Sequence, residues 1–136
     1  MKKYFLFSLI FLLIICGCGK KQDLNESDFV AQIYHSEMRG IDAATTYRYY
    51  IYRDGKNFKY VKTKSSITIA GEGEAKEIKK GKIKTKTDLI ELDKDIEKDK
   101  INGATTDITY FYREEDGTDT RYDSIEALTD RVFKQE

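Results

Sequence analysis

The chain has 136 residues, with 24 basic and 24 acidic side chains and a formal net charge of zero at pH 7. This length suits one domain, and a core of that size is stable without disulfides or metals. Because the charges balance, the chain as a whole has no electrostatic attraction to nucleic acid, and we expect no nucleic-acid partner.

The first eighteen residues have the layout of an export signal. Lys2 and Lys3 precede an apolar run from Tyr4 to Cys16, which only Ser8 interrupts, and a small residue and a cysteine follow. A basic start, a short apolar middle and a small-residue cleavage site are the three parts of such a signal. The run is shorter than the roughly 20 residues that a membrane-spanning helix needs.

The end of this segment, Ile15-Cys16-Gly17-Cys18, resembles the signal of bacterial lipoproteins. Ile15 is the branched aliphatic residue three positions before the last cysteine, and Gly17 is the small residue directly before it. The resemblance implies that residues 1–17 are a signal peptide and that Cys18 is lipidated, for example with palmitate. An uncleaved anchor helix, a cut elsewhere and a simple secretory signal are the alternatives.

This resemblance also implies where the protein is located. Residues 18–26 become a lipidated N-terminus and a polar tether, and residues 27–136 form a single domain on the outer side of the cell membrane, in the cell envelope. Two or more acyl chains make such attachment durable. The chain has no cysteine besides Cys16 and Cys18, so the mature domain is expected to fold without disulfides.

The first segment of the domain, Ser27–Met38, is predicted to form a short N-terminal helix. Phe29, Ile33 and Tyr34 fall at helical spacing within it. A loose strand or a disordered tether is the alternative. His35, the only histidine of the chain, is predicted to lie on the surface of this helix.

An internal repeat then organises the domain. Ile41–Arg53 and Ile101–Arg113 are identical at seven of thirteen positions. Each copy runs into an Asp-Gly pair and a second β-rich segment, which is a strong hairpin signal. We therefore predict two pseudo-repeated hairpin–helix units, at about 41–100 and 101–136.

The end of each unit is predicted to be a helix. Apolar residues recur there at steps of three and four, the helical period. They are Leu89, Leu92 and Ile96 in the first unit, and Ile125, Leu128 and Val132 in the second. Asp88, with Glu91 three residues on, is a candidate start for the first helix, and Ser124 is a candidate cap for the second.

An insertion in the first unit, residues 63–80, is predicted to add further strands. The segment Ala75–Thr85 alternates isoleucine with lysine, as a half-buried strand does. Together these elements predict an α+β fold. We expect an antiparallel sheet of about six strands with two helices on one face, plus the short N-terminal helix.

Tyrosines are the most prominent candidate binding residues. Alternation along a strand places Tyr50 and Tyr52 on one face. The repeat places Tyr110 and Tyr112 with them, so we expect all four to line one face of the sheet. Exposed aromatic rows bind proteins and sugars. The alternative is that tyrosine is present only because it favours strands, with this face closed by the N-terminal segment.

The sequence lacks the signs of a catalytic or metal site. No nucleophile elbow or glycine-rich oxyanion loop accompanies His35. The acidic segment Glu114–Asp119 does not match the spacing of the twelve-residue calcium loop, and we interpret it as an acidic turn. We expect no catalytic residue, no bound metal and no cofactor.

Size and predicted location favour binding over catalysis. We expect a small extracytoplasmic module, for example of an inhibitory or immunity type, that binds a protein, peptide or glycan beside the membrane. A tether raises the local concentration of such a binder at the surface. A cell-envelope hydrolase or wall-modifying enzyme is one alternative, and a structural subunit of an envelope complex is another.

Overall fold

In a computed structural model of the chain, the structure describes residues 25–38, 43–99 and 105–134. The predicted signal peptide, Cys18 and all but the last two residues of the tether lie outside the described residues. The elements are η2 (Glu26–Asp28), β1 (Phe29–Met38), β2 (Ala43–Asp54), β3 (Asn57–Thr68), β4 (Gly71–Glu72), β5 (Lys76–Ile83), α2 (Lys86–Asp99), β6 (Thr105–Arg113), β7 (Asp119–Tyr122) and α3 (Ile125–Val132).

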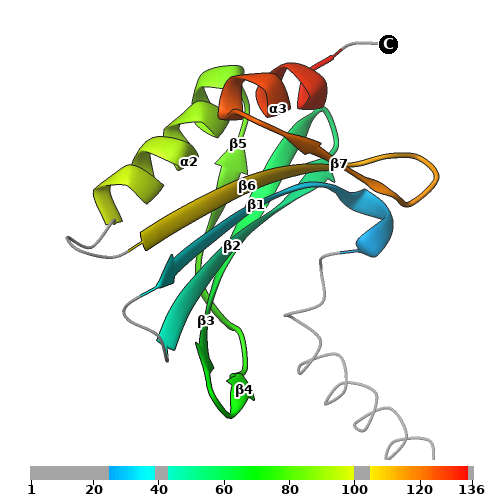
Figure 1. The fold of residues 1–136 in the computed structure, drawn as a ribbon. Helices are drawn as coiled ribbons and strands as arrows, with labels where there is room; N and C mark the ends of the chain where they lie inside the picture. Colours follow the sequence, from blue (N-terminus) through cyan, green and yellow to red (C-terminus); the bar gives the residue numbers. More distant parts are fainter. Residues whose placement is uncertain (1–24, 39–42, 100–104, 135–136) are drawn as a thin grey trace, which may run out of the picture.

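The described strands form one seven-stranded antiparallel sheet, and α2 and α3 are the two helices that the sequence predicts (Figure 1). The predicted α+β class is therefore confirmed. The strand order is β4-β3-β2-β1-β6-β7, and β5 pairs with β3 on the same edge as β4. β1 pairs with both β2 and β6, so the first strand of the chain is central. The sheet has one strand more than expected because β4, a pair of residues, adds to the edge.

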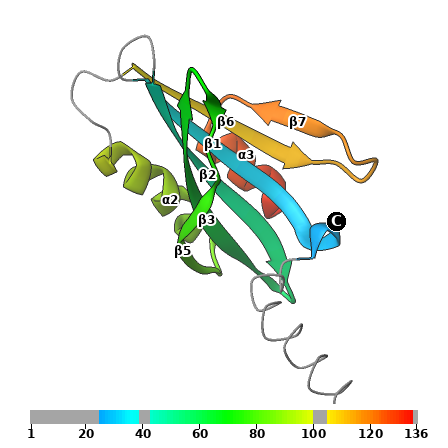
Figure 2. The ribbon, with the colours of Figure 1, turned by 90° about the horizontal axis from the view of Figure 1, so that it is seen from below.

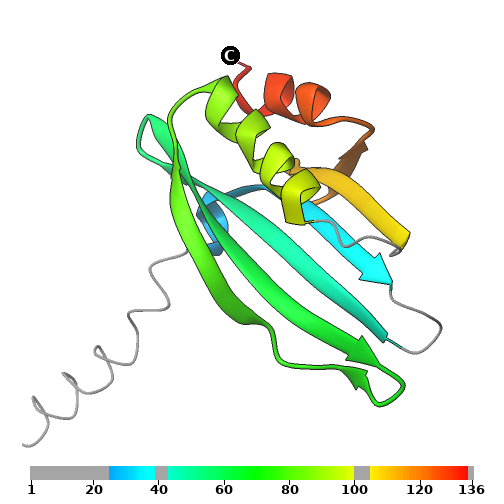
Figure 3. The same ribbon diagram turned by 90° about the vertical axis from the view of Figure 1, so that its left-hand side faces the viewer.

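Both helices lie on the same side of the sheet (Figure 1; Figure 3). The core lies between these two layers and includes the predicted helix residues Leu89, Leu92, Ile96, Ile125, Leu128 and Val132, all buried. Burial of each such side chain contributes about 1.5–3 kcal/mol, so sheet and helices stabilise one another. Among the described residues, neither helix is long and apolar enough to span a bilayer.

The predicted N-terminal helix over Ser27–Met38 is wrong. After the single turn of η2, the segment is a ten-residue strand. Ala31 and Ile33 alternate with half-buried Gln32 and Tyr34, and all pair with β2 on one side. Strand pairing on both edges satisfies the backbone of every such residue, and this tertiary gain outweighs the local helical spacing.

The helix starts follow capping chemistry. Ser124 caps α3 as predicted, because its Oγ accepts a hydrogen bond from the Ala127 backbone N–H at 3.1 Å. For α2 the cap is Thr85, whose Oγ1 accepts from the backbone N–H of Asp88 at 3.2 Å. The Asp88 carboxylate in turn accepts from the Thr85 N–H at 2.9 Å. Asp88 therefore completes a capping box one turn inside the helix instead of beginning it.

Both predicted hairpin turns are present. Gly55 (φ 61°) lies in the turn between β2 and β3, and Gly117 (φ 85°) in the turn between β6 and β7. Positive φ at these positions favours glycine, which explains the Asp-Gly pairs. The predicted strand over Ala75–Thr85 is β5, although only Ile83 is buried and the rest is an exposed, lysine-rich edge. Lysines on an edge strand discourage pairing with other chains.

Candidate functional site

The four tyrosines predicted to share a face do not share it. Ile33 of β1 lies opposite Tyr49 on one side and Tyr110 on the other. Directly opposed residues in antiparallel strands point to the same face, so Tyr110 and Tyr112 lie on the helix-covered face. Tyr50 and Tyr52 point to the opposite face, and we call that face the open face.

The physical reason is the register of the sheet. The sequence repeat aligns Tyr50 with Tyr110, but β1 pairs Tyr50 with Gln32 and Tyr110 with Ile33. A shift of one residue moves every side chain of a strand to the other face. Tyr110 is buried, and its hydroxyl donates to Asp93 Oδ1 of α2 at 2.6 Å.

The open face carries five half-buried aromatic side chains, contributed by three adjacent strands. They are Phe29, Tyr34, Tyr50, Tyr52 and Phe111. The ring of Phe29 lies 5.7 Å from that of Tyr52 and 6.1 Å from that of Tyr50. Neither α2 nor α3 lies over this face, which is seen in front of these two helices in Figure 2, and the single turn of η2 borders it beside Tyr52. The rings therefore form one contact surface.

Two arginines are fixed on this face. Arg113 stacks on the Phe29 ring at 4.8 Å and bonds to Asp119 at 2.6 Å. Arg48 lies over the Tyr34 ring at 5.3 Å and pairs with Glu72 at 3.4 Å. Such cation–π contacts hold the guanidinium groups in place beside the rings.

Electrostatics distinguish the Tyr52 hydroxyl from that of a water-exposed tyrosine. Burial, and after it the electrostatic interactions with Tyr50 and Glu26, raise the pKa of Tyr52. Burial opposes the charge of Arg48, but its interactions with Tyr50, Glu72 and Tyr34 together outweigh this and raise the Arg48 pKa. At neutral pH Tyr52 is therefore a neutral hydrogen-bond donor and Arg48 a permanent cation.

A cleft of about 870 Å³ adjoins the open face where β1 begins. It is lined by η2, the β2–β3 and β6–β7 turns and the end of α3. Phe29 and Arg113 belong to both surfaces. Three arginines of the cleft are stacked on rings: Arg53 on Phe58, Arg113 on Phe29 and Arg131 on Tyr112, at 5.3, 4.8 and 4.2 Å. The cleft is thus an extension of the same aromatic and arginine-rich surface.

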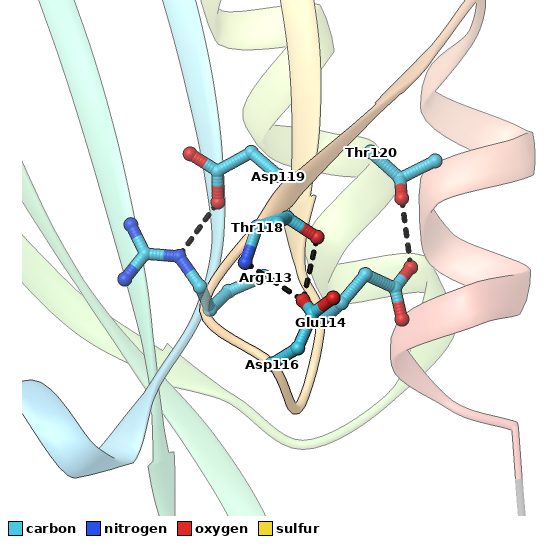
Figure 4. A network of polar contacts seen from close by, with 6 residues as sticks. All are labelled: Arg113, Glu114, Asp116, Thr118, Asp119 and Thr120. Atoms are coloured by element: carbon cyan, nitrogen blue, oxygen red, sulfur yellow. Dashed lines mark hydrogen bonds and ion pairs between the residues drawn. The ribbon is translucent and has the colours of Figure 1, made fainter.

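The acidic segment Glu114–Asp119 is the turn between β6 and β7, as expected (Figure 4). Asp116 accepts hydrogen bonds from the backbone and the hydroxyl of Thr118, which lower the Asp116 pKa. Glu114 accepts from Thr120 at 2.9 Å. The carboxylates of Glu114 and Asp116 therefore stabilise the turn. Within residues 25–38, 43–99 and 105–134, no group of three or more metal-binding side chains comes together.

The prediction that His35 lies on the surface of a helix is wrong, because His35 is a buried residue of strand β1. It is 1% exposed, stacks on Tyr47 at 5.3 Å, and its Nε2 lies 3.2 Å from Oε1 of fully buried Glu37. Both side chains point to the helix-covered face, because they alternate with Ser36 along β1. Their burial separates the only imidazole of the chain from solvent and from the cleft.

The site residues that the sequence analysis missed are Phe29, Tyr34 and Phe111. Phe29 and Tyr34 fall in the segment predicted to be a helix. The repeat aligns Phe111 with Ile51, which alternates with Tyr50 and Tyr52, and so puts it on the opposite face. Strand alternation within β1 would have placed Tyr34 once that segment was taken as a strand. Phe29, five residues earlier, joins the same face only because the pairing with β2 is irregular between Phe29 and Ala31. Comparison with protein-family models, with curated proteins and with solved structures finds no match to this chain.

Proposed function

We propose that this protein is a lipid-anchored, outward-facing binding module of the bacterial cell envelope. Its open face captures a partner close to the membrane, and Tyr50 and Tyr52 are its central contact residues. The single observation that supports this proposal is the group of five half-buried rings on the sheet face that neither α2 nor α3 covers (Figure 1; Figure 3). Tyrosine and arginine are the residues that most often dominate binding energy at interfaces.

The five rings of the open face, which we call its aromatic centre, favour a binding role over a catalytic one. The rings are held by one another and by stacked arginines, and the carboxylates of Glu72 and Asp119 are paired with those arginines. The alternative of a hydrolase would need His35 or an acid pair at an accessible position, and His35 is 1% exposed. If the protein is instead a structural subunit of an envelope complex, the same open face would bind the other subunits permanently. We also propose that the domain arose by duplication of one hairpin–helix unit, now represented by residues 41–100 and 101–136.

Site-specific photocrosslinking tests the binding role. We expect a photoreactive phenylalanine analogue at Tyr52 of the full-length chain, in the native cell, to give a discrete crosslinked product. The matched control is the same analogue at Glu126, an exposed position on α3 at the other side of the sheet. Equal crosslinking from both positions, or none from Tyr34, Tyr50 and Tyr52, contradicts the proposal.

Lipidation is tested independently by metabolic labelling. We expect radiolabelled palmitate to enter the full-length chain and the Cys16→Ser variant, but not Cys18→Ser. The reason is that the acyl chain is carried by the cysteine that follows the cleavage site, and serine has no thiol to acylate. Gel autoradiography after membrane fractionation reads out both the label and the location. Label in Cys18→Ser, or none in the native chain, rejects the anchor.

A further inference from the structure

Cations border the aromatic centre of the open face. Lys59 on β3 and Lys82 on β5 lie opposite each other and extend the row of Tyr52 across the sheet. In the next row, Lys80 on β5 and Arg121 on β7 stand at opposite ends. None of these four cations forms an ion pair with another residue that the structure describes.

The acidic side chains of this face do not cancel that charge. They are Asp54, Glu72, Glu77, Asp107 and Asp119, and Glu26 of η2 lies close enough to act on Tyr52 and Arg113. Glu72 and Asp119 are paired with Arg48 and Arg113. Glu77 lies level with Arg48, and Asp107 lies in the row after it, farther from Tyr52. Around Tyr52, the four cations Lys59, Lys80, Lys82 and Arg121 outnumber the two acids Asp54 and Glu26, so this half of the face has a net positive charge.

The open face has aromatic residues and arginines at its centre and lysines at its rim, a composition typical of protein–protein interfaces. Aromatic residues and arginine are enriched at interface centres, and lysine is depleted there. Of the large apolar side chains that are well exposed in the described chain, Met38, Ile69 and Ile78, none lies in the aromatic centre. Insertion of this face into lipid would need such protruding side chains.

We propose that the open face recognises an acidic polypeptide segment, an inference that rests on the proposed binding function. Tyr50 and Tyr52 supply the contact area. Lys59, Lys82 and Arg121 attract carboxylates of the partner and speed the encounter. Since these cations are at the rim and in water, their attraction depends on ionic strength, with screening over about 8 Å at physiological salt.

Fluorine NMR of the full-length chain in detergent micelles, labelled with 3-fluorotyrosine, tests this inference. The probe is a random copolymer of glutamate and tyrosine. We expect the resonances of Tyr50 and Tyr52 to shift on titration and that of Tyr49, on the helix-covered face, to stay in place. Each resonance is assigned from its Tyr→Phe variant. A titration without shifts at Tyr50 and Tyr52 overturns the inference.

Two double variants provide a matched pair. Lys59→Glu with Lys82→Glu reverses one cross-strand pair on the open face. Lys64→Glu with Lys76→Glu reverses the equivalent pair between the same strands on the opposite face. We expect the first to weaken copolymer binding about tenfold and the second to leave it within about twofold. Equal weakening by both overturns the inference.

Two further probes distinguish other partner classes. Alginate is an anionic polysaccharide, and phosphatidylglycerol vesicles are an anionic lipid surface. If either shifts the Tyr50 and Tyr52 resonances at lower concentration than the copolymer, a polypeptide is the wrong class. Crosslinking from Tyr52 in cells, combined with failure of the copolymer, rejects only the acidic partner. Absence of crosslinking rejects the binding function itself.

Discussion

Replacing His35 with leucine is expected to lower the free energy of unfolding by about 3–5 kcal/mol. The Glu37 carboxylate is fully buried, and no residue that the structure describes donates a hydrogen bond to either of its oxygens. His35, with Nε2 at 3.2 Å, supplies its counter-charge when protonated. Removing that group takes this partner away from a fully buried carboxylate. Urea unfolding of the full-length chain in detergent, followed by circular dichroism, measures the loss.

The matched control is the double variant His35→Leu with Glu37→Leu. Replacing both members of a buried ion pair with apolar residues is often neutral, so most of the lost stability is expected to return. A double-mutant cycle with Glu37→Leu alone isolates the coupling between the two side chains. A single His35→Leu variant that unfolds within about 1 kcal/mol of the native chain would show that the pair is not coupled as described.

Replacing Ile33 with alanine is expected to cost about 2–5 kcal/mol. Ile33 is completely buried in the central strand, between Tyr49 on β2 and Tyr110 on β6. Truncation removes its apolar contacts and leaves a cavity that strands paired on both sides cannot close. The same urea unfolding experiment measures it, as a lower midpoint with an unchanged slope.

Gln32→Ala is the control for Ile33→Ala, because it changes the adjacent residue on the open face. Its expected cost is below about 1 kcal/mol, as for most substitutions outside a core. A larger loss at Gln32 than at Ile33 would mean that the two faces of β1 have been assigned the wrong way round. That result would also move Tyr50 and Tyr52 to the covered side.

Local signals in the sequence predicted most of the secondary structure. Leu128 and its neighbours at helical spacing, with Ser124 before them, specify α3, because both the period and the cap are properties of a few adjacent residues. The Asp-Gly turns specified two hairpins for the same reason. His35 and Phe29 were misassigned because their segment has weak local preference, and only its two neighbours in the sheet make it a strand.

The candidate site was predicted in part. Tyr50 and Tyr52 do share a face, since alternation along one strand is a local rule. The assignment of Tyr110 and Tyr112 to that face failed because it depended on how two distant strands align with β1. Repeated sequence carries no information on that alignment, and a difference of one residue reverses the result.

The sequence by itself determined the helical and hairpin segments, the α+β class and the alternation of Tyr50 with Ile51. Each of these follows from interactions within about ten neighbouring residues. Only the tertiary structure decided which side of the sheet the helices cover, that β1 lies in its centre, and that Phe29 and Phe111 join the tyrosines. Those outcomes depend on the hydrogen-bond register between strands far apart in the chain, which forms only when the whole sheet assembles.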